Sequence, residues 1–504
     1  MNRIITILLA GFETSLPIGT ISIAVLAIFL SYFVWHQYGC PRISCINSYA
    51  GDWSRKRARQ AFLERGQQLL AEGAKRYGDE PFRIITTLGE RIILPKSCIH
   101  WVEGHSDLDH QAQVAEEFMG AYPGFEGIGA FNDPNRFVID LVKKKMSSLT
   151  APMLSTFYEE AIAVLDEEFG DSNEFRRIDW AVICSRLTSR ISAAIFAGGI
   201  LAKDPRWQNV TQTYTSNLFQ ACRALRAWPA PLRPIVVWYL KECKVCRDQI
   251  AEARKILAEH QFGTAERDTA FTWMDPRADP VIVQLALAAG ALHTTSQLLN
   301  QALLDLAYAA SDGQSVVDQL QKEFGTCLEA SGGKILPSTL PKMNIMEACI
   351  KETQRLKPQT LTNLDRLALK AVVLPNGVRV PKGTMISVNQ ATMWDADTWG
   401  EDALVWDPMR WFEPGTTELG RERLVNSSDR HFAFGKGRFI CPGRLLVNGE
   451  LKVALGVILD GWEVRLCKED YEEAKKKGRG RVDWVPFGFE MLADGRAGVE
   501  VRRR

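Results

Sequence analysis

The sequence predicts a mainly α-helical protein with a smaller β region, preceded by one N-terminal transmembrane helix. Three observations lead to this fold class. The chain has 504 residues, of which 46% are hydrophobic, and this is enough apolar material for a large core. An uncharged stretch covers residues 18–35, and most segments between residues 133 and 328 show helical periodicity. Strand-like patterns occur in two shorter regions, residues 82–95 and 366–388.

The uncharged stretch, IGTISIAVLAIFLSYFVW, is 18 residues long and just spans the hydrocarbon layer of a membrane. Trp35 and Tyr38 lie at its end, where amphipathic rings prefer the membrane interface. Only Arg3 precedes the stretch, whereas several basic residues follow it: Arg42, Arg55, Lys56, Arg57 and Arg59. The basic side stays in the cytoplasm, and no convincing cleavage site follows the stretch. We therefore expect an uncleaved anchor in residues 1–38 and one large cytoplasmic unit in residues 39–504.

Charge and cysteine content narrow the class of protein further. The formal net charge is +1, which gives no reason to expect a nucleic-acid partner. The 11 cysteines are scattered, without the dense spacing of a secreted disulfide scaffold. This usage indicates reduced thiols that face the cytosol.

Local patterns place the first elements of the large unit. Helical periodicity runs from about residue 55 to 76, and a hairpin around Gly89 is expected in residues 82–95. A second hairpin is expected at Asn376-Gly377, because this dipeptide suits a tight turn between strands.

A long helix is expected over residues 279–310. Asp279 is a natural N-cap and Pro280 a natural first helical residue. Gly290 lies in the middle of this helix, where glycine costs about 1 kcal/mol relative to alanine. The hydroxyl of Thr294, four residues later, can bond the Gly290 carbonyl, bend the helix and open a groove.

The segment FAFGKGRFICPGR, residues 432–444, surrounds Cys441 with residues that remove side chains. Gly435 and Gly437 allow a bulged turn whose backbone can approach a flat group closely. Pro442 suits a first helical position, and the run that follows is largely apolar. A thiolate at the start of a helix is stabilised by backbone N–H groups, as a metal ligand requires.

In this segment the chain resembles the cytochrome P-450 family of haem-thiolate monooxygenases. The resemblance implies haem b as the cofactor and Cys441 as the axial ligand of its iron. It places the following loop residues at the cofactor: Phe434, Gly435, Gly437, Arg438 and Gly443. The family usually has Arg or His two residues before the cysteine, in contact with a haem propionate. Phe439 stands there in this chain, so that contact is missing.

Further matches to the family are spread along the chain. Glu352 and Arg355 form an E-x-x-R pair, a common pattern that also occurs elsewhere in the sequence. Its distance from the cysteine and the later WDPMRWF segment make it resemble the family's structural pair. The resemblance implies that Arg410 completes a Glu–Arg–Arg cluster that braces the cysteine loop. It also implies that Arg366 contacts a haem propionate.

Two features of the family are altered or absent. The segment GALHTT resembles the oxygen-binding segment, with Thr294 at the threonine position. His293 replaces the usual acidic residue, as in fungal microsomal members, and it either relays protons or only packs. The usual Trp-x-x-x-Arg helix is not visible. Lys143 is its possible replacement, although a solvated charge run explains this lysine better.

Other candidate residues carry weaker signals. Cys243 and Cys246 form a C-x-x-C pair, which we interpret as thiols on a helix surface rather than a redox or zinc site. Three histidines recur at intervals of five, which does not favour a metal site: His100, His105 and His110. Four aromatic residues fall where the family places a loop over the substrate, although core packing explains them equally well: Phe118, Tyr122, Phe125 and Phe131.

The resemblance implies a membrane-anchored monooxygenase of the endoplasmic reticulum. It implies electrons from NADPH through NADPH–cytochrome P-450 reductase, with cytochrome b5 as a further candidate donor, because no flavin or nicotinamide motif is visible. The expected substrate is a lipophilic small molecule of fungal specialised metabolism, such as a terpenoid, an indole-terpenoid or a polyketide. Two alternatives stay open: a haem-thiolate isomerase or dehydratase that needs no reductase, and a non-catalytic haem-binding sensor.

Overall fold

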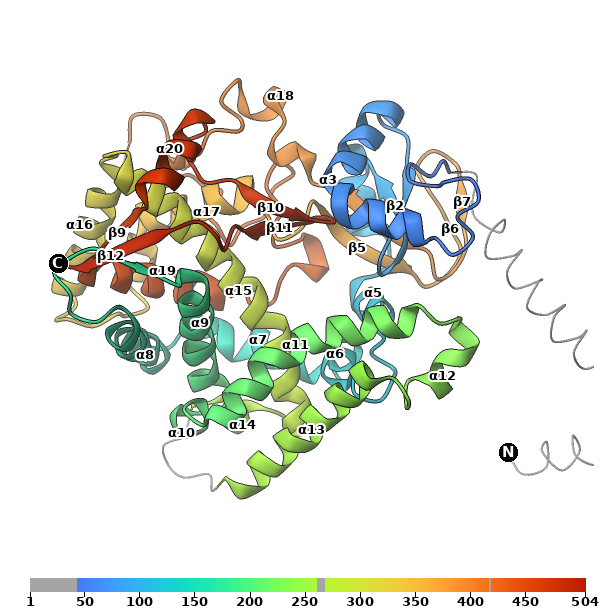
Figure 1. The fold of residues 1–504 in the computed structure, drawn as a ribbon, viewed down its shortest axis with the longest axis horizontal. Helices are drawn as coiled ribbons and strands as arrows, with labels where there is room; N and C mark the ends of the chain where they lie inside the picture. The colour runs from blue at the N-terminus through green and yellow to red at the C-terminus, as the bar shows by residue number, and fades with distance from the viewer. Residues whose placement is uncertain (1–42, 261–267, 417) are drawn as a thin grey trace, which may run out of the picture.

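A helix of 32 residues, α15 (Pro280–Ser311), runs through the middle of the fold (Figure 1). The computed structural model describes residues 43–260, 268–416 and 418–504. Helices surround α15, and a smaller β-rich part with α3 lies at one end of the molecule. This arrangement confirms the expected mainly α fold. The expected transmembrane stretch, residues 18–35, lies outside the described residues.

The start of α15 follows from its sequence. The Asp279 carboxylate accepts hydrogen bonds from the amides of Val281 and Ile282, and Pro280 occupies the first turn. Within the described chain, α15 alone is long and apolar enough to cross a membrane, but more than half of its most apolar window is buried inside the fold. We therefore assign α15 as a core helix.

The other helices form a layer around α15, with α9, α11 and α17 among its direct neighbours. The helices of the first half are α3 (Lys56–Tyr77), α4 (Ile99–Gly104), α5 (His110–Glu117), α6 (Glu126–Gly129), α7 (Phe137–Lys144), α8 (Ala151–Phe169), α9 (Trp180–Phe196), α10 (Gly199–Ala202), α11 (Pro205–Arg226), α12 (Arg233–Val236) and α13 (Lys241–Glu259). Those of the second half are α14 (Ala270–Trp273), α16 (Val316–Glu329), α17 (Asn344–Leu356), α18 (Ala396–Trp399), α19 (Arg444–Gly461) and α20 (Lys468–Lys476).

The largest sheet has the strand order β1-β2-β8-β5-β3. Its strands are β1 (Phe82–Thr86), β2 (Gly89–Leu94), β3 (Leu108–Asp109), β5 (Thr362–Ala368) and β8 (Met385–Asn389). The β2–β8 pair is parallel and the other pairs are antiparallel. Smaller sheets pair β6 (Val372–Val373) with β7 (Arg379–Val380), β10 (Trp484–Phe487) with β11 (Glu490–Ala493), and β12 (Val499–Arg503) with both β4 (Arg176–Ile178) and β9 (Trp462–Leu466).

Both predicted hairpins are confirmed. Thr86 and Gly89 close the β1–β2 turn, and Gly377 has the positive φ of 82° that the β6–β7 turn requires. The predicted helix near residues 55–76 is α3, and the long helix starts within one residue of its expected position.

Two local predictions were wrong. Helix α19 begins at Arg444, so Pro442 lies in the preceding turn rather than in the first helical turn. Cys243 and Cys246 do not lie on a helix surface, because both are fully buried on α13 where it packs against α11. Burial raises the pKa of both thiols, to about 11 and about 12, which favours unreactive core thiols.

Candidate functional site

The segment before α19 folds into a tight turn that returns Cys441 to Phe434. The Cys441 amide donates to the Phe434 carbonyl at 2.7 Å, and the Gly435 amide donates to Phe432 at 2.8 Å. Gly435 and Gly437 have φ angles of 74° and 66°, a region that other residues rarely adopt. These contacts fix the direction of the cysteine side chain.

The turn also sets the electrostatics of the sulfur. Burial raises the pKa of the Cys441 thiol above its ordinary value, whereas the backbone amides of Gly443 and Arg444 and the Arg444 charge act to lower this pKa. The Arg444 guanidinium donates to the carbonyls of Val425 and Cys441. A thiolate here therefore meets two N–H donors and a nearby cation, an environment that suits a metal-ligating sulfur.

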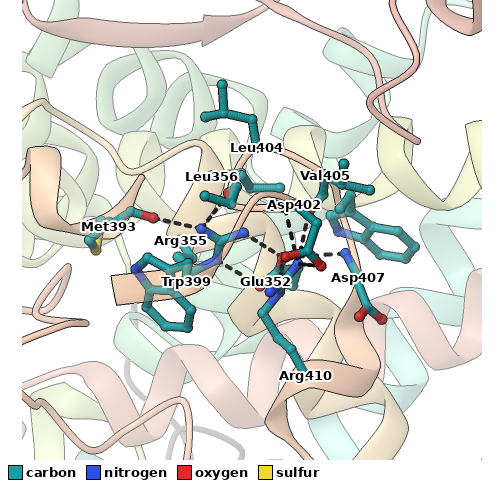
Figure 2. Close-up of polar contacts among 12 residues, drawn as sticks. Glu352, Arg355, Leu356, Met393, Trp399, Asp402, Leu404, Val405, Asp407 and Arg410 are labelled. Atoms are coloured by element: carbon teal, nitrogen blue, oxygen red, sulfur yellow. Dashed lines mark hydrogen bonds and ion pairs between the residues drawn. The ribbon is translucent and has the colours of Figure 1, made fainter. Parts of the chain in front are cut away.

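Helix α17 carries a fully buried ion pair, which Figure 2 shows. Arg355 donates from Nε and Nη2 to the two Glu352 carboxylate oxygens, at 2.9 and 2.7 Å. Its Nη1 donates to the carbonyls of Met393 and Ala403. Neither charged side chain is exposed to solvent. Each oxygen and nitrogen therefore needs its partners, because a buried charge without them is strongly destabilising.

The same carboxylate binds three further groups from the segment that precedes the turn. Arg410 Nε donates to Glu352 at 2.9 Å, Trp411 Nε1 at 3.0 Å and the Asp407 amide at 3.3 Å. Arg410 also pairs with Asp402 at 3.2 Å. The structure thus brings Glu352, Arg355 and Arg410 into one cluster.

Two residues connect this cluster and the large sheet to the cysteine turn. The Trp411 ring contacts the ring of buried His431 edge-to-face at 5.6 Å, directly before the turn. Asn363 of β5 donates its amide to the carbonyls of Phe432 and Ala433, both at 3.0 Å. Sequence reasoning missed Trp411 and Asn363. The WDPMRWF segment contains Trp411, whereas no sequence pattern marks Asn363.

On α15, three exposed positions interrupt a helix that is otherwise mostly buried. They are Gly290, His293 and Thr294, which share one face because they are spaced by three and four residues. The Thr294 hydroxyl donates to the Gly290 carbonyl at 3.0 Å. A Cβ atom at Gly290 would lie 3.0 Å from Cζ of Phe131. The helix therefore presents a polar, closely lined surface at this point.

His293 lies on the same face but contacts an aromatic residue. Its ring meets the Phe219 ring of α11 edge-to-face at 6.4 Å, and Phe219 in turn meets Phe118 at 5.2 Å. Although His293 is partly exposed, the protein around its ring displaces water and lowers the pKa of His293 below its ordinary value, which favours the neutral imidazole. No hydrogen bond of the His293 ring is present among the described residues. Of the other aromatic candidates, Phe125 is fully buried.

Arg366 lies on β5 and is 2% exposed. Its Nη1 donates to the Asp365 carbonyl at 2.9 Å, and its guanidinium lies 4.8 Å from the centre of the Phe439 ring. Within the described chain its buried Nε has no hydrogen-bond partner. Burial lowers the pKa of Arg366 to about 10. The site therefore contains a buried cation with spare donor capacity.

The remaining sequence candidates lie farther from this surface or have other partners. A Cβ atom at Gly437 would collide with the Glu103 side chain at 2.6 Å, so the missing side chain makes room for α4. At Gly443 the nearest atom to such a Cβ is Val142 Cγ1, at 3.9 Å. Lys143 is exposed on α7. Among the described residues, no three histidine, cysteine or acidic side chains gather as a metal site.

The fold and this site define a class of enzyme in which a cysteine thiolate holds a haem. The cytochrome P450 family model matches residues 136–482. Cytochrome P450 monooxygenase pyr3 of Aspergillus fumigatus is 30% identical over an alignment that covers 96% of this chain and 94% of that protein. Cytochrome P450 monooxygenase hepE of Aspergillus oryzae is 30% identical, covering 82% and 78%, and adrA of Penicillium rubens is 28% identical, covering 99% and 98%. The chain belongs to the cytochrome P450 family.

Membership makes the protein a haem-thiolate monooxygenase with haem b as its cofactor. The residues present fit that cofactor. The half-buried Cys441 residue has amide donors for the charged form of its sulfur, and Arg366 has an unpartnered buried donor that suits a carboxylate. Haem b carries iron for the sulfur and propionate carboxylates for the cation.

The cluster on α17 leads to a stability prediction. Changing Glu352→Gln removes the counter-charge of Arg355 and leaves a buried cation, so we expect the protein to lose about 3–5 kcal/mol of stability. Thermal unfolding of the haem-loaded protein measures this loss. The matched control is Asp248→Asn, which removes the carboxylate of an exposed ion pair with Lys244. Equal unfolding midpoints for the two variants would show that the cluster does not brace the fold.

Proposed function

We propose that the protein is a membrane-anchored monooxygenase that inserts oxygen into a lipophilic small molecule of fungal specialised metabolism. The single observation that carries the site assignment is the turn that directs the Cys441 thiol between backbone amides. Support for a fungal role comes from relatives in Aspergillus and Penicillium. Support for the anchor comes from the uncharged residues 18–35. Terpenoids, indole-terpenoids and polyketides are the candidate substrates.

Each candidate residue has a proposed task. Cys441 ligates the iron, and the bound haem supplies dioxygen activation assisted by electron donation from the thiolate. Thr294, bonded to the Gly290 carbonyl, offers a hydroxyl on the exposed face of α15, where a proton donor can bind. Arg366 binds a haem carboxylate, and Glu352 with Arg355 and Arg410 holds the cysteine turn in place.

The reaction needs a redox partner, since the family obtains its electrons from other proteins. We assign this role to NADPH–cytochrome P-450 reductase, with cytochrome b5 as a second candidate donor. Both fit a location on the cytoplasmic face of the endoplasmic reticulum, with residues 1–38 as the anchor and 39–504 as the catalytic domain. NADPH consumption that depends on the reductase and rises with substrate separates this function from an isomerase or a sensor.

The ligand assignment is tested by Cys441→Ala. Without the sulfur, reduced protein with carbon monoxide should lose the long-wavelength Soret band of thiolate-bound haem. Cys246→Ala is the matched control, because this buried thiol lies on α13 and should leave the band intact. Retention of the band by Cys441→Ala would mean that another residue is the ligand.

The role of α15 is tested by Thr294→Ala. This change removes the bond to Gly290, so we expect haem binding and NADPH consumption to persist while most electrons appear as hydrogen peroxide. Thr295→Ala is the control, since Thr295 is the next residue and is buried away from the exposed face. The ratio of product to NADPH measures the effect. Coupling in Thr294→Ala equal to that of the wild type would contradict the assignment.

The anchor is tested by deleting the residues through Tyr38. We expect a folded, haem-loaded protein with clearly reduced sedimentation with membranes, because the only long uncharged stretch before the fold is removed. Loss of haem binding would instead mean that this stretch is part of the catalytic domain. Unchanged sedimentation would place the membrane contact elsewhere.

A further inference from the structure

Arg366 is a buried cation that no carboxylate of the described chain contacts directly, although Asp365, Asp109 and Glu103 lie near enough to act on its charge. In the described chain it forms no ion pair, and its Nε has no acceptor. The adjacent Asp365 carboxylate binds Arg91 at 3.1 Å and accepts from the Ser387 hydroxyl, so it is engaged elsewhere. Burying a charged guanidinium costs free energy unless an anion pairs with it. The geometry therefore calls for a carboxylate beside Arg366.

The residue that should help Arg366 in this family is replaced. Phe439 carries no donor, and the guanidinium groups of Arg366 and Arg438 lie over its ring at 4.8 and 4.6 Å. Nη2 of Arg438 is engaged by the protein, where it donates to three carbonyls: those of His105, Ser106 and Leu108. Arg438 is otherwise exposed, so a less exposed second donor for the carboxylates is sought on a different element.

His110, the first residue of α5, is in the right place. Its Nδ1 lies 3.0 Å from the Asp365 carbonyl, the same oxygen that accepts from Arg366 Nη1. Its ring meets the Phe439 ring edge-to-face at 6.1 Å. The Asp365 carbonyl oxygen thus contacts both Arg366 and His110. Both side chains also lie against Phe439, which stands where the family usually has Arg or His.

The shared carbonyl also fixes the protonation pattern of His110. A carbonyl only accepts, so Nδ1 carries a hydrogen and Nε2 is left free to face a ligand. Nε2 has no partner in the described part of the chain. Nε2 can donate to a carboxylate only when the imidazole is protonated, and a neighbouring carboxylate favours that charged form.

We propose that His110, in its protonated form, binds a haem propionate together with Arg366 and replaces the base that Phe439 displaces. This inference rests on the position of the haem carboxylates beside Arg366 that was proposed above. The groups that face His110 are Arg366, Asp365 and Asp109. Without the haem, burial and then Arg366 lower the pKa of His110, so haem binding is accompanied by proton uptake.

Resonance Raman spectra of the haem-loaded protein test this, because the propionate bending bands report hydrogen bonds to the carboxylates. We expect His110→Phe to shift these bands. We also expect it to speed haem transfer to apomyoglobin about 10- to 100-fold, the equivalent of one lost charge-assisted hydrogen bond. His100→Phe is the matched control, since His100 lies in the same region but is highly exposed and pairs with Asp429.

A second variant separates the proposed contact from a packing effect. His110→Gln can still donate from its amide but cannot be protonated. In the wild type, haem transfer should become faster as the pH rises through the His110 pKa of the haem-loaded protein, because the charged donor is lost. His110→Gln should keep bands close to those of the wild type at low pH and show no such pH dependence.

The outcomes distinguish the role of His110 from the placement of the haem carboxylates beside Arg366. If His110→Phe matches His100→Phe in both bands and transfer rate, or if His110→Gln keeps the pH dependence, the role of His110 is wrong. If Arg366→Met also leaves the bands in place, the haem carboxylates do not lie beside Arg366 and the proposed placement fails as well. The carbon monoxide spectrum is a separate readout, so neither result bears on Cys441 as ligand.

Discussion

The rest of the site depends on one buried carboxylate, that of Glu352. It accepts from Arg355, Arg410, Trp411 and the Asp407 amide, and its side chain has no exposure to solvent. Coulomb attraction at this depth is strong, but so is the cost of removing the charges from water. The cluster is therefore stable only when all its partners are present. These contacts hold α17 and residues 402–411 in a fixed position relative to each other.

A short series of contacts connects this cluster to the turn that carries Cys441. Trp411 donates a hydrogen bond to Glu352, and its ring contacts His431. Asn363 of the large sheet donates to the carbonyls of the two residues after His431. The Phe434 carbonyl then receives the Cys441 amide. Since the helical layer and the sheet both hold the turn, the direction of the cysteine is set by the whole fold.

Local patterns made much of the fold predictable. Hairpin turns and the long helix depend on residues close in sequence, such as Asn376-Gly377 and Asp279-Pro280, and these predictions agree with the structure. The start of α19 was misplaced because Pro442 fits either a turn or a first helical residue. Cys243 and Cys246 were misplaced because the C-x-x-C spacing does not show which face of α13 packs against α11.

The site was predictable only where a motif carries it. Glu352, Arg355 and Arg410 stand in recognisable segments, and the structure brings them together. Asn363 and His110 stand in none, and their roles depend on which carbonyl each side chain reaches. Gly437 illustrates the same limit, because its small size serves Glu103 of α4, more than 300 residues earlier in the chain.

We propose that the turn before α19 presents the Cys441 sulfur to the haem iron. X-ray absorption at the iron edge of the purified, haem-loaded protein tests it most directly, because it identifies the atoms bound to iron. We expect one sulfur in the first coordination shell in addition to the four porphyrin nitrogens. A first shell that contains only nitrogen and oxygen atoms would contradict it.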